Sequence, residues 1–164
     1  VLSPLGLIKL LDREVSELSG GELQKVAVAA CLARKATVYL LDEPSAFLDV
    51  EERLAMARVV RRNVEGLKAS ALIVEHDIVV QDFIADRLMV FLGEPGRRGE
   101  ASKPLGLREG MNRFLESLKV TFRRDPQTGR PRVNKEGSRL DRYQKELGEY
   151  YYVPAGKVEV EEEE

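Results

Sequence analysis

Apolar runs alternate with amphipathic stretches along the first 92 positions of the chain. Three short β-prone runs predict strands at residues 37–41, 71–74 and 88–92. The first run is apolar almost throughout, which favours a strand covered on both faces. Helical spacing predicts three helices, over residues 22–33, 50–66 and 78–86. Strands that alternate with helices are typical of a parallel sheet, so we predict an α/β fold.

The composition changes after residue 93. Gly, Pro and Arg become frequent over residues 94–99, which marks a domain boundary. A further helix is predicted near residues 108–118, and turn signals and a charged stretch at 139–147 follow it. We therefore predict three parts, namely the α/β domain at residues 1–93, a C-terminal extension at 94–152 and an acidic tail without fixed structure at 153–164.

The charge of the chain is distributed in the same way. The 164 residues carry a net charge of −2. Residues 1–96 hold 11 Lys/Arg against 15 Asp/Glu, residues 97–145 hold 14 against 6, and residues 146–164 hold 1 against 7. The extension is thus a basic block between two acidic ones, and a basic block suits contact with an anionic partner such as RNA.

The composition also excludes several classes of site. The single cysteine, Cys31, cannot form a disulfide within the chain, a four-cysteine zinc site or an iron–sulfur cluster held by this chain alone. The sequence has no run of about 18 apolar residues, so we expect no membrane span and no membrane partner. A cytoplasmic location is the expected one.

The segment Leu18–Gln24 reads LSGGELQ and directly precedes an apolar helix. Ser19 and Glu22 have the spacing of a capping box, which alone indicates only where a helix begins. Gly20 and Gly21, however, place bare backbone amides at the helix N-terminus, where the partial positive charge suits a phosphate. The whole segment therefore favours phosphate binding over a simple cap.

Two acids, Asp42 and Glu43, follow the first predicted strand. Ligands collect at the carboxyl ends of parallel strands, and successive strand residues point to opposite sides. One acid can therefore reach Mg²⁺ through water while the other polarises an attacking water. The alternative is that both acids only begin a loop and cap the next helix.

Two further polar residues lie beside these acids in the predicted topology. Asp49 has cap spacing with Glu52, so a structural role is at least as well supported as a functional one. His76 is the only histidine, and it follows the second predicted strand, 33 positions after Glu43. A lone histidine is more often structural or solvated, but its place at a strand end favours a catalytic role.

Taken together, these segments resemble the ATP-binding-cassette ATPases. Residues 18–24 are similar to the signature motif, residues 40–43 to the end of the Walker B strand, residues 45–49 to the D-loop and His76 to the switch histidine. The resemblance implies a partial P-loop NTPase domain with a parallel sheet and helices, plus a C-terminal extension, and it implies ATP and Mg²⁺ as cofactors. It assigns Glu43 and His76 to catalysis and Asp42 to the magnesium side. It assigns contacts with nucleotide across a pair of cassettes to Ser19, Gly20, Gly21, Glu22, Gln24 and Asp49.

The rest of the chain narrows the resemblance. Residues 110–115, 121–126, 130–135 and 150–152 are similar to the C-terminus of the RNase L inhibitor family, in its archaeal form. These proteins are twin-cassette ATPases that split ribosomes for recycling in archaea and eukaryotes. The resemblance implies a role in translation. The partners it implies are a second nucleotide-binding cassette, the small ribosomal subunit with its rRNA, and termination and initiation factors.

The sequence also departs from the family pattern. It contains no Gly-x-x-x-x-Gly-Lys-Ser/Thr phosphate loop, so the chain is similar to the C-terminal part of the second cassette, and by itself we expect little or no ATP turnover. The iron–sulfur clusters belong to an N-terminal domain of the family that this chain does not contain. Two other readings stay open, a transporter-type cassette ATPase and a non-catalytic docking fragment for the ribosome or a partner protein. The basic block can contact RNA, with Phe114, Phe122 and Tyr143 for stacking, or pack between cassettes as a hinge.

Overall fold

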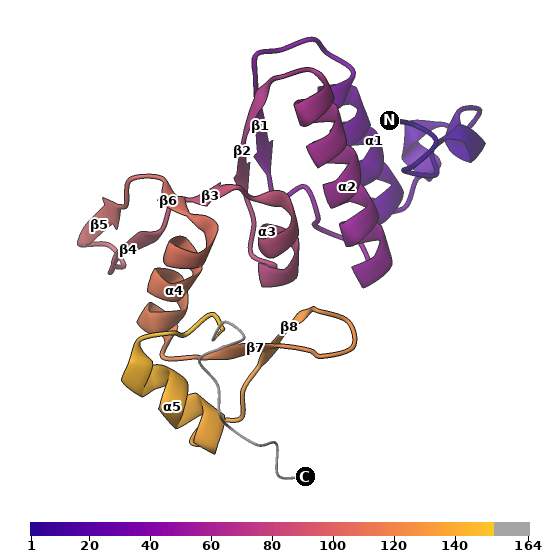
Figure 1. Cartoon of the computed structure of the whole chain (residues 1–164). Coiled ribbons are helices and arrows are strands. Elements are labelled where there is room, and N and C mark those ends of the chain that lie inside the picture. Colours follow the sequence, from indigo (N-terminus) through magenta and orange to yellow (C-terminus); the bar gives the residue numbers. More distant parts are fainter. Residues whose placement is uncertain (153–164) are drawn as a thin grey trace. The chain divides into compact units, whose positions relative to one another are not determined.

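The computed structural model describes residues 1–152, and its fold is of the predicted α/β class. The chain divides into two compact units, Val1–Ile84 and Ala85–Glu164 (Figure 1). The boundary predicted between residues 93 and 94 falls inside the second unit. The predicted acidic tail at 153–164 lies outside the described residues.

The first unit is a two-stranded parallel sheet with three α-helices. Its elements are two 3₁₀ turns at Ile8–Leu10 and Val15–Glu17, then α1 (Gly20–Leu32), β1 (Val38–Asp42), α2 (Val50–Gly66), β2 (Ser70–Val74) and α3 (Ile78–Ile84). The strands pair in register from Val38 opposite Ser70 to Asp42 opposite Val74. This parallel pairing brings the carboxyl ends of both strands, and the residues that follow them, to the same edge of the sheet.

One face of this sheet is packed and the other is exposed. Tyr39 and Leu41 point into a core that includes α2 residues such as Met56, which is fully buried. On the opposite face Leu40 is 70% exposed and Leu72 is 56% exposed. The prediction that the first strand is covered on both faces is therefore wrong for the described residues. The apolar run reflects apolar side chains on both faces of the strand. Among residues 1–152, however, no element covers the face that carries Leu40.

The second unit combines short antiparallel strand pairs with two helices. Its elements are β3 (Arg87–Leu88), β4 (Phe91–Glu94), β5 (Arg98–Ala101), β6 (Leu105–Gly106), α4 (Leu107–Leu118), β7 (Phe122–Arg124), β8 (Pro131–Val133) and α5 (Arg139–Leu147). The single parallel strand predicted at residues 88–92 does not form. Instead, β3 pairs with β6 and β4 pairs with β5, and both pairs are antiparallel. The chain reverses after β4, where Arg97 N–H donates to the Glu94 carbonyl (3.0 Å). This tight turn fixes the pairing, which the apolar run by itself does not.

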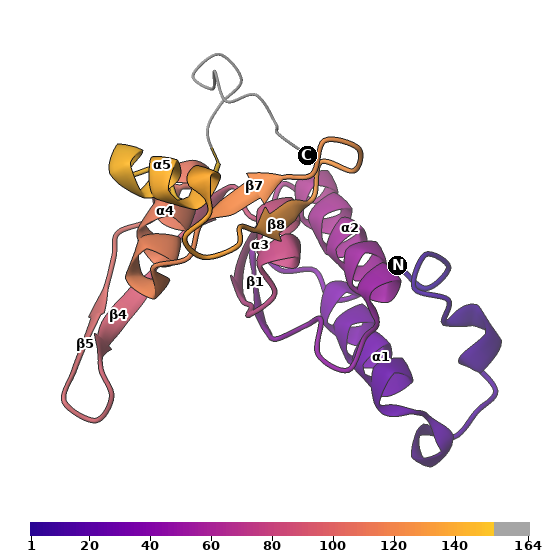
Figure 2. The same cartoon turned by 90° about the horizontal axis from the view of Figure 1, so that it is seen from below.

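A buried polar network joins α5 to β7 and β8. Asp141 accepts a hydrogen bond from Thr121 Oγ1 (2.6 Å), and Asn134 Nδ2 donates to the same Thr121 oxygen (3.0 Å). Gln144 Nε2 donates to the Phe122 carbonyl (2.9 Å), so α5 lies beside β7 (Figure 2). Because each of these buried polar groups has a partner, the network fixes how helix and hairpin pack.

In the described part of the chain, no helix has both the length and the apolar character needed to cross a membrane.

Candidate functional site

The N-terminus of α1 carries the predicted capping box. Ser19 Oγ accepts from the Glu22 N–H (3.3 Å), and Glu22 Oε2 accepts from the Ser19 N–H (3.0 Å). The Ser19 backbone N–H, followed by its hydroxyl, holds the pKa of Glu22 below its ordinary value. The side chains of Ser19 and Glu22 are thus engaged with each other. The amides of Gly20 and Gly21, at the start of the helix, are the groups best placed to meet an anion.

The loop after β1 approaches these two glycines closely. A Cβ at Gly21 would lie 2.9 Å from the Phe47 carbonyl oxygen, and a Cβ at Gly20 would lie 3.7 Å from the Phe47 ring. Phe47 itself has a positive φ of 62° and is 79% exposed. Position 21 therefore requires glycine, because any side chain there would displace the loop that carries Phe47.

Glu43 and His76 lie against each other at the carboxyl ends of β1 and β2. Glu43 Oε1 is 2.9 Å from His76 Nε2, with the Glu43 side chain 50% exposed and that of His76 78% exposed. The Glu43 N–H donates to the Val74 carbonyl (2.9 Å), which extends the strand pairing by one residue. Both residues lie at strand ends, as the sequence predicted, and the parallel register brings them into contact although they are 33 positions apart. Both side chains are open to a ligand.

Asp42 ends β1 with an exposed side chain. An exposed carboxylate suits a hard cation such as Mg²⁺. Among residues 1–152, however, no three His, Cys, Asp or Glu side chains are grouped so that they could hold a metal ion. Asp42 fits the role of one oxygen ligand or of a partner to a coordinated water, and the remaining ligands must come from water, phosphate or other protein segments.

Asp49 is the N-cap of α2. Its Oδ1 accepts from the Glu52 N–H at 2.9 Å, which confirms the structural role left open by the sequence. The resemblance places Gln24 among the nucleotide contacts. Its side-chain Nε2 donates a hydrogen bond to the Glu43 carbonyl oxygen (3.1 Å). A contact of either residue with nucleotide stays a prediction.

Glu75 is the member of this cluster that the sequence reasoning missed. Its carboxylate accepts from the Ser45 N–H (3.0 Å), the Ser45 hydroxyl (2.9 Å) and the His76 N–H (3.2 Å). Glu75 thus ties the loop after β1 to the loop after β2 and fixes the backbone of His76. The available signal was its position, an acid between the second predicted strand and the only histidine.

Comparisons with known proteins identify the family of the chain. The ABC transporter family matches residues 1–46. An uncharacterized ABC transporter ATP-binding protein of Methanocaldococcus jannaschii is 61% identical over 93% of this chain, and the translation initiation factor rli1 of Schizosaccharomyces pombe is 47% identical over the same share. A solved structure titled RNase-L Inhibitor superposes with a TM-score of 0.87 at 65% identity over 93% of this chain. The chain belongs to the RNase L inhibitor family of ATP-binding-cassette proteins.

Within this family the chain corresponds to a fraction of a larger protein. It spans 26% of the length of the two curated relatives and 30% of the matched RNase-L Inhibitor chain. Two further solved structures match at 62–65% identity and 93% coverage of this chain. One is titled a complex of the archaeal ribosomal stalk protein aP1 with the archaeal ribosome recycling factor aABCE1 (TM-score 0.86, 29% of that chain), the other a model of ribosome-bound archaeal Pelota and ABCE1 (TM-score 0.88, 26% of that chain).

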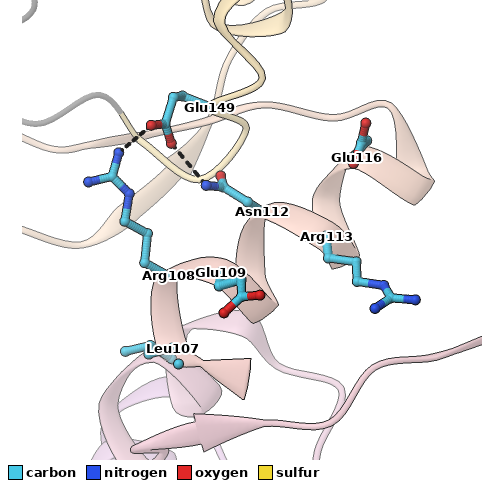
Figure 3. A pocket seen from close by; sticks show the side chains of 8 residues that line it. Leu107, Arg108, Glu109, Asn112, Arg113, Glu116 and Glu149 are labelled. Atoms are coloured by element: carbon cyan, nitrogen blue, oxygen red, sulfur yellow. Dashed lines mark hydrogen bonds and ion pairs between the residues drawn. The ribbon is translucent and has the colours of Figure 1, made fainter. Parts of the chain in front are cut away.

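The second unit has a groove along α4, which contains none of the residues of the ATP-binding-cassette motifs (Figure 3). Glu149 lines it, pairs with Arg108 (2.7 Å) and accepts from Asn112 Nδ2 (2.9 Å). The other charges on its rim, Glu109, Arg113 and Glu116, are of both signs. Because its charges largely pair or cancel, the groove is not a candidate catalytic site.

Proposed function

We propose that this chain is the C-terminal part of the second nucleotide-binding cassette of a cytoplasmic, ATP-hydrolysing ribosome-recycling factor. The observation that carries the proposal is the contact between Glu43 and His76 at the edge of the parallel sheet, in the same unit as the glycine-rich N-terminus of α1. The relatives support the biological setting, since their names and titles refer to translation initiation, ribosome recycling and a ribosome-bound complex.

In this proposal Glu43, His76 and Asp42 serve the ATP bound by their own cassette. Glu43 orients and deprotonates the attacking water, and His76, 2.9 Å away, holds the Glu43 carboxylate and contacts the γ-phosphate. Asp42 is the residue of this chain that would hold Mg²⁺. When bound, Mg²⁺ neutralises the charge that develops on the phosphate oxygens. The phosphate loop that grips this ATP does not occur in the present sequence, so we expect residues 1–164 alone to turn over ATP poorly or not at all.

The N-terminus of α1 serves the ATP held by a second cassette. Gly20 and Gly21 offer backbone N–H groups to its γ-phosphate, and Ser19 fixes the helix start that aims them. Asp49, at the N-terminus of α2, lies on the loop that would reach the interface between cassettes. Termination and initiation factors are the further partners that we expect for the assembled protein.

The direct test is ATP-driven separation of ribosomal subunits by the full-length protein. We expect purified archaeal ribosomes to dissociate with Mg²⁺ and ATP but not with ADP, measured by light scattering and by sucrose-gradient profiles. Subunit separation that is independent of nucleotide would favour the non-catalytic docking fragment. ATP hydrolysis stimulated by membrane components and not by ribosomes would favour a transporter-type cassette.

The basic block at residues 97–145, which lies within the second unit, is proposed to contact the rRNA of the small subunit. Arg123 and Arg132 are direct cross-strand partners in the β7–β8 hairpin, and both are exposed. Like charges directly opposite each other destabilise a hairpin, and an RNA phosphate between them would remove that cost. Asn134 accepts from Arg123 (3.2 Å), and Asp125 pairs with Arg132 (2.8 Å), so both guanidinium groups are held in place. Packing against a second cassette is the competing possibility.

The two possibilities predict different salt dependence. Replacing Arg123 and Arg132 by Gln is expected to weaken binding to ribosomal RNA and to lower the slope of log affinity against log salt by about 2, one for each lost phosphate contact. Fluorescence anisotropy with labelled rRNA fragments measures both quantities. Arg97→Gln with Arg98→Gln, which removes the same number of arginines from the β4–β5 hairpin, is the matched control. An unchanged slope with weaker association of the cassettes would favour the hinge.

A further inference from the structure

We propose that Gln24 is a positioning residue for Glu43 and not a ligand of the nucleotide. This inference rests on the proposed function, because it concerns how the general base is held. Gln24 lies in the second turn of α1, and its Nε2 donates to the Glu43 carbonyl oxygen at 3.1 Å. The side-chain amide that the resemblance placed toward ATP is therefore directed at the backbone of the same cassette.

Glu43 needs such support because its backbone conformation is unfavourable. Its φ is +45°, in the left-handed region that residues other than glycine rarely adopt. A conformation of this kind persists at a functional site only when the surroundings hold it. The Glu43 N–H donates to the Val74 carbonyl (2.9 Å), and its own carbonyl accepts from the Ala46 N–H (3.0 Å) and from Gln24. Of these three bonds, only the one from Gln24 comes from a side chain, and that side chain belongs to α1.

The same turns of α1 contact the loop after β1 twice. Gly21 lies under the Phe47 carbonyl, and Gln24 holds the Glu43 carbonyl, three residues further along the helix. Glu43 in turn is 2.9 Å from His76. In the proposed function, the N-terminal amides of α1 face the ATP held by a second cassette. The same helix therefore also fixes the direction of the Glu43 carboxylate toward His76. Removing the Gln24 amide leaves the other two backbone bonds in place, so the fold should persist while the carboxylate loses part of its alignment.

Gln24→Met tests this role, because it keeps the length of the side chain and removes the donor. In the full-length protein we expect kcat for ATP hydrolysis to fall about five- to tenfold, the scale of one net hydrogen bond between neutral groups, with KM for ATP unchanged. Gln24→Lys retains a donor and is expected to recover most of the loss. Asn63→Leu is the matched control, since it removes a side-chain amide that donates to the Leu32 carbonyl (3.4 Å), away from the site.

The 164-residue chain provides a second measurement that does not depend on turnover. Gln24→Met should move the imidazole resonances of His76 in NMR spectra, and Asn63→Leu should leave them in place. A rise in KM with kcat unchanged would overturn the proposal, because it would make Gln24 a nucleotide ligand. Unchanged kcat together with unmoved His76 resonances would overturn it as well. Absence of ATP hydrolysis in the unsubstituted full-length protein would contradict the proposed function instead, and the His76 resonances would then decide the role of Gln24.

Discussion

Replacing Glu43 by Gln in the full-length protein is expected to slow ATP hydrolysis at this cassette about 100- to 10,000-fold, the usual contribution of a positioned general base. Gln matches Glu in shape but cannot accept the proton of the attacking water. It can still meet His76, whose Nε2 is 2.9 Å from the Glu43 carboxylate, so the loop should stay folded and nucleotide should still bind. The protein would then remain in its ATP-bound state.

The measurement is single-turnover phosphate release with protein in excess over γ-labelled ATP, so that loss of one cassette appears as loss of a kinetic phase. Glu65→Gln is the matched control, because Glu65 lies in the last turn of α2 and pairs with Arg61 at 2.9 Å. Its variant should behave like the unsubstituted protein. Hydrolysis by the Glu43 variant at the full rate in every phase would remove Glu43 from the mechanism.

Replacing Asp141 by Ala is expected to destabilise the second unit by about 3 kcal/mol, because it leaves buried hydrogen-bond donors without their acceptor. Asp141 is 2% exposed. It accepts from Thr121 Oγ1 (2.6 Å) and the Gly137 N–H (2.9 Å) and pairs with Lys145 (2.9 Å). Four of the five tyrosines lie in residues 143–152, so tyrosine fluorescence during urea unfolding reports mainly on this unit. Glu146→Gln, on the exposed side of the same helix, should change stability little.

The same residue predicts a dependence on pH. Burial would raise the pKa of Asp141, but hydrogen bonds from Thr121, Lys145 and Gly137 outweigh it and hold the pKa below its ordinary value of 3.8. A depressed carboxyl pKa gives stability that is complete above the unfolded-state value and is lost as the pH falls through the folded-state value. The second unit should therefore weaken below about pH 4, and the Asp141 variant should lose part of that dependence. Identical pH profiles for both proteins would contradict this assignment.

Local sequence patterns determined most elements of the first unit. The capping box at Ser19, the cap at Asp49 and the apolar periods between them placed α1 and α2 within two residues of their observed bounds. Such signals are local, because a cap and an apolar stripe depend on neighbours three or four positions away. Residues 139–147 stood out only as a charged stretch, since most residues of α5 are charged and the two that it buries, Asp141 and Gln144, are polar.

The candidate site divides in the same way. From the sequence, Asp42, Glu43 and His76 could be placed at the carboxyl ends of neighbouring strands, because a parallel sheet brings those ends to one edge. Spacing alone predicted the capping pair of Ser19 and Glu22 and placed the two glycines between them at the start of α1. Glu75, with three bonds to Ser45 and His76, and Gln24, with its bond to the Glu43 carbonyl, did not follow from any spacing.

Local patterns were thus enough to predict the α/β class, the motif residues and the caps. Tertiary structure decided that the apolar run at 88–92 divides between two antiparallel pairs, that one face of β1 and β2 stays exposed, and that Gln24 faces Glu43. The physical reason is the range of the interactions. Caps and amphipathic periods act over one turn of chain, whereas strand partners and bonds from a side chain to a distant carbonyl depend on which segments meet after folding.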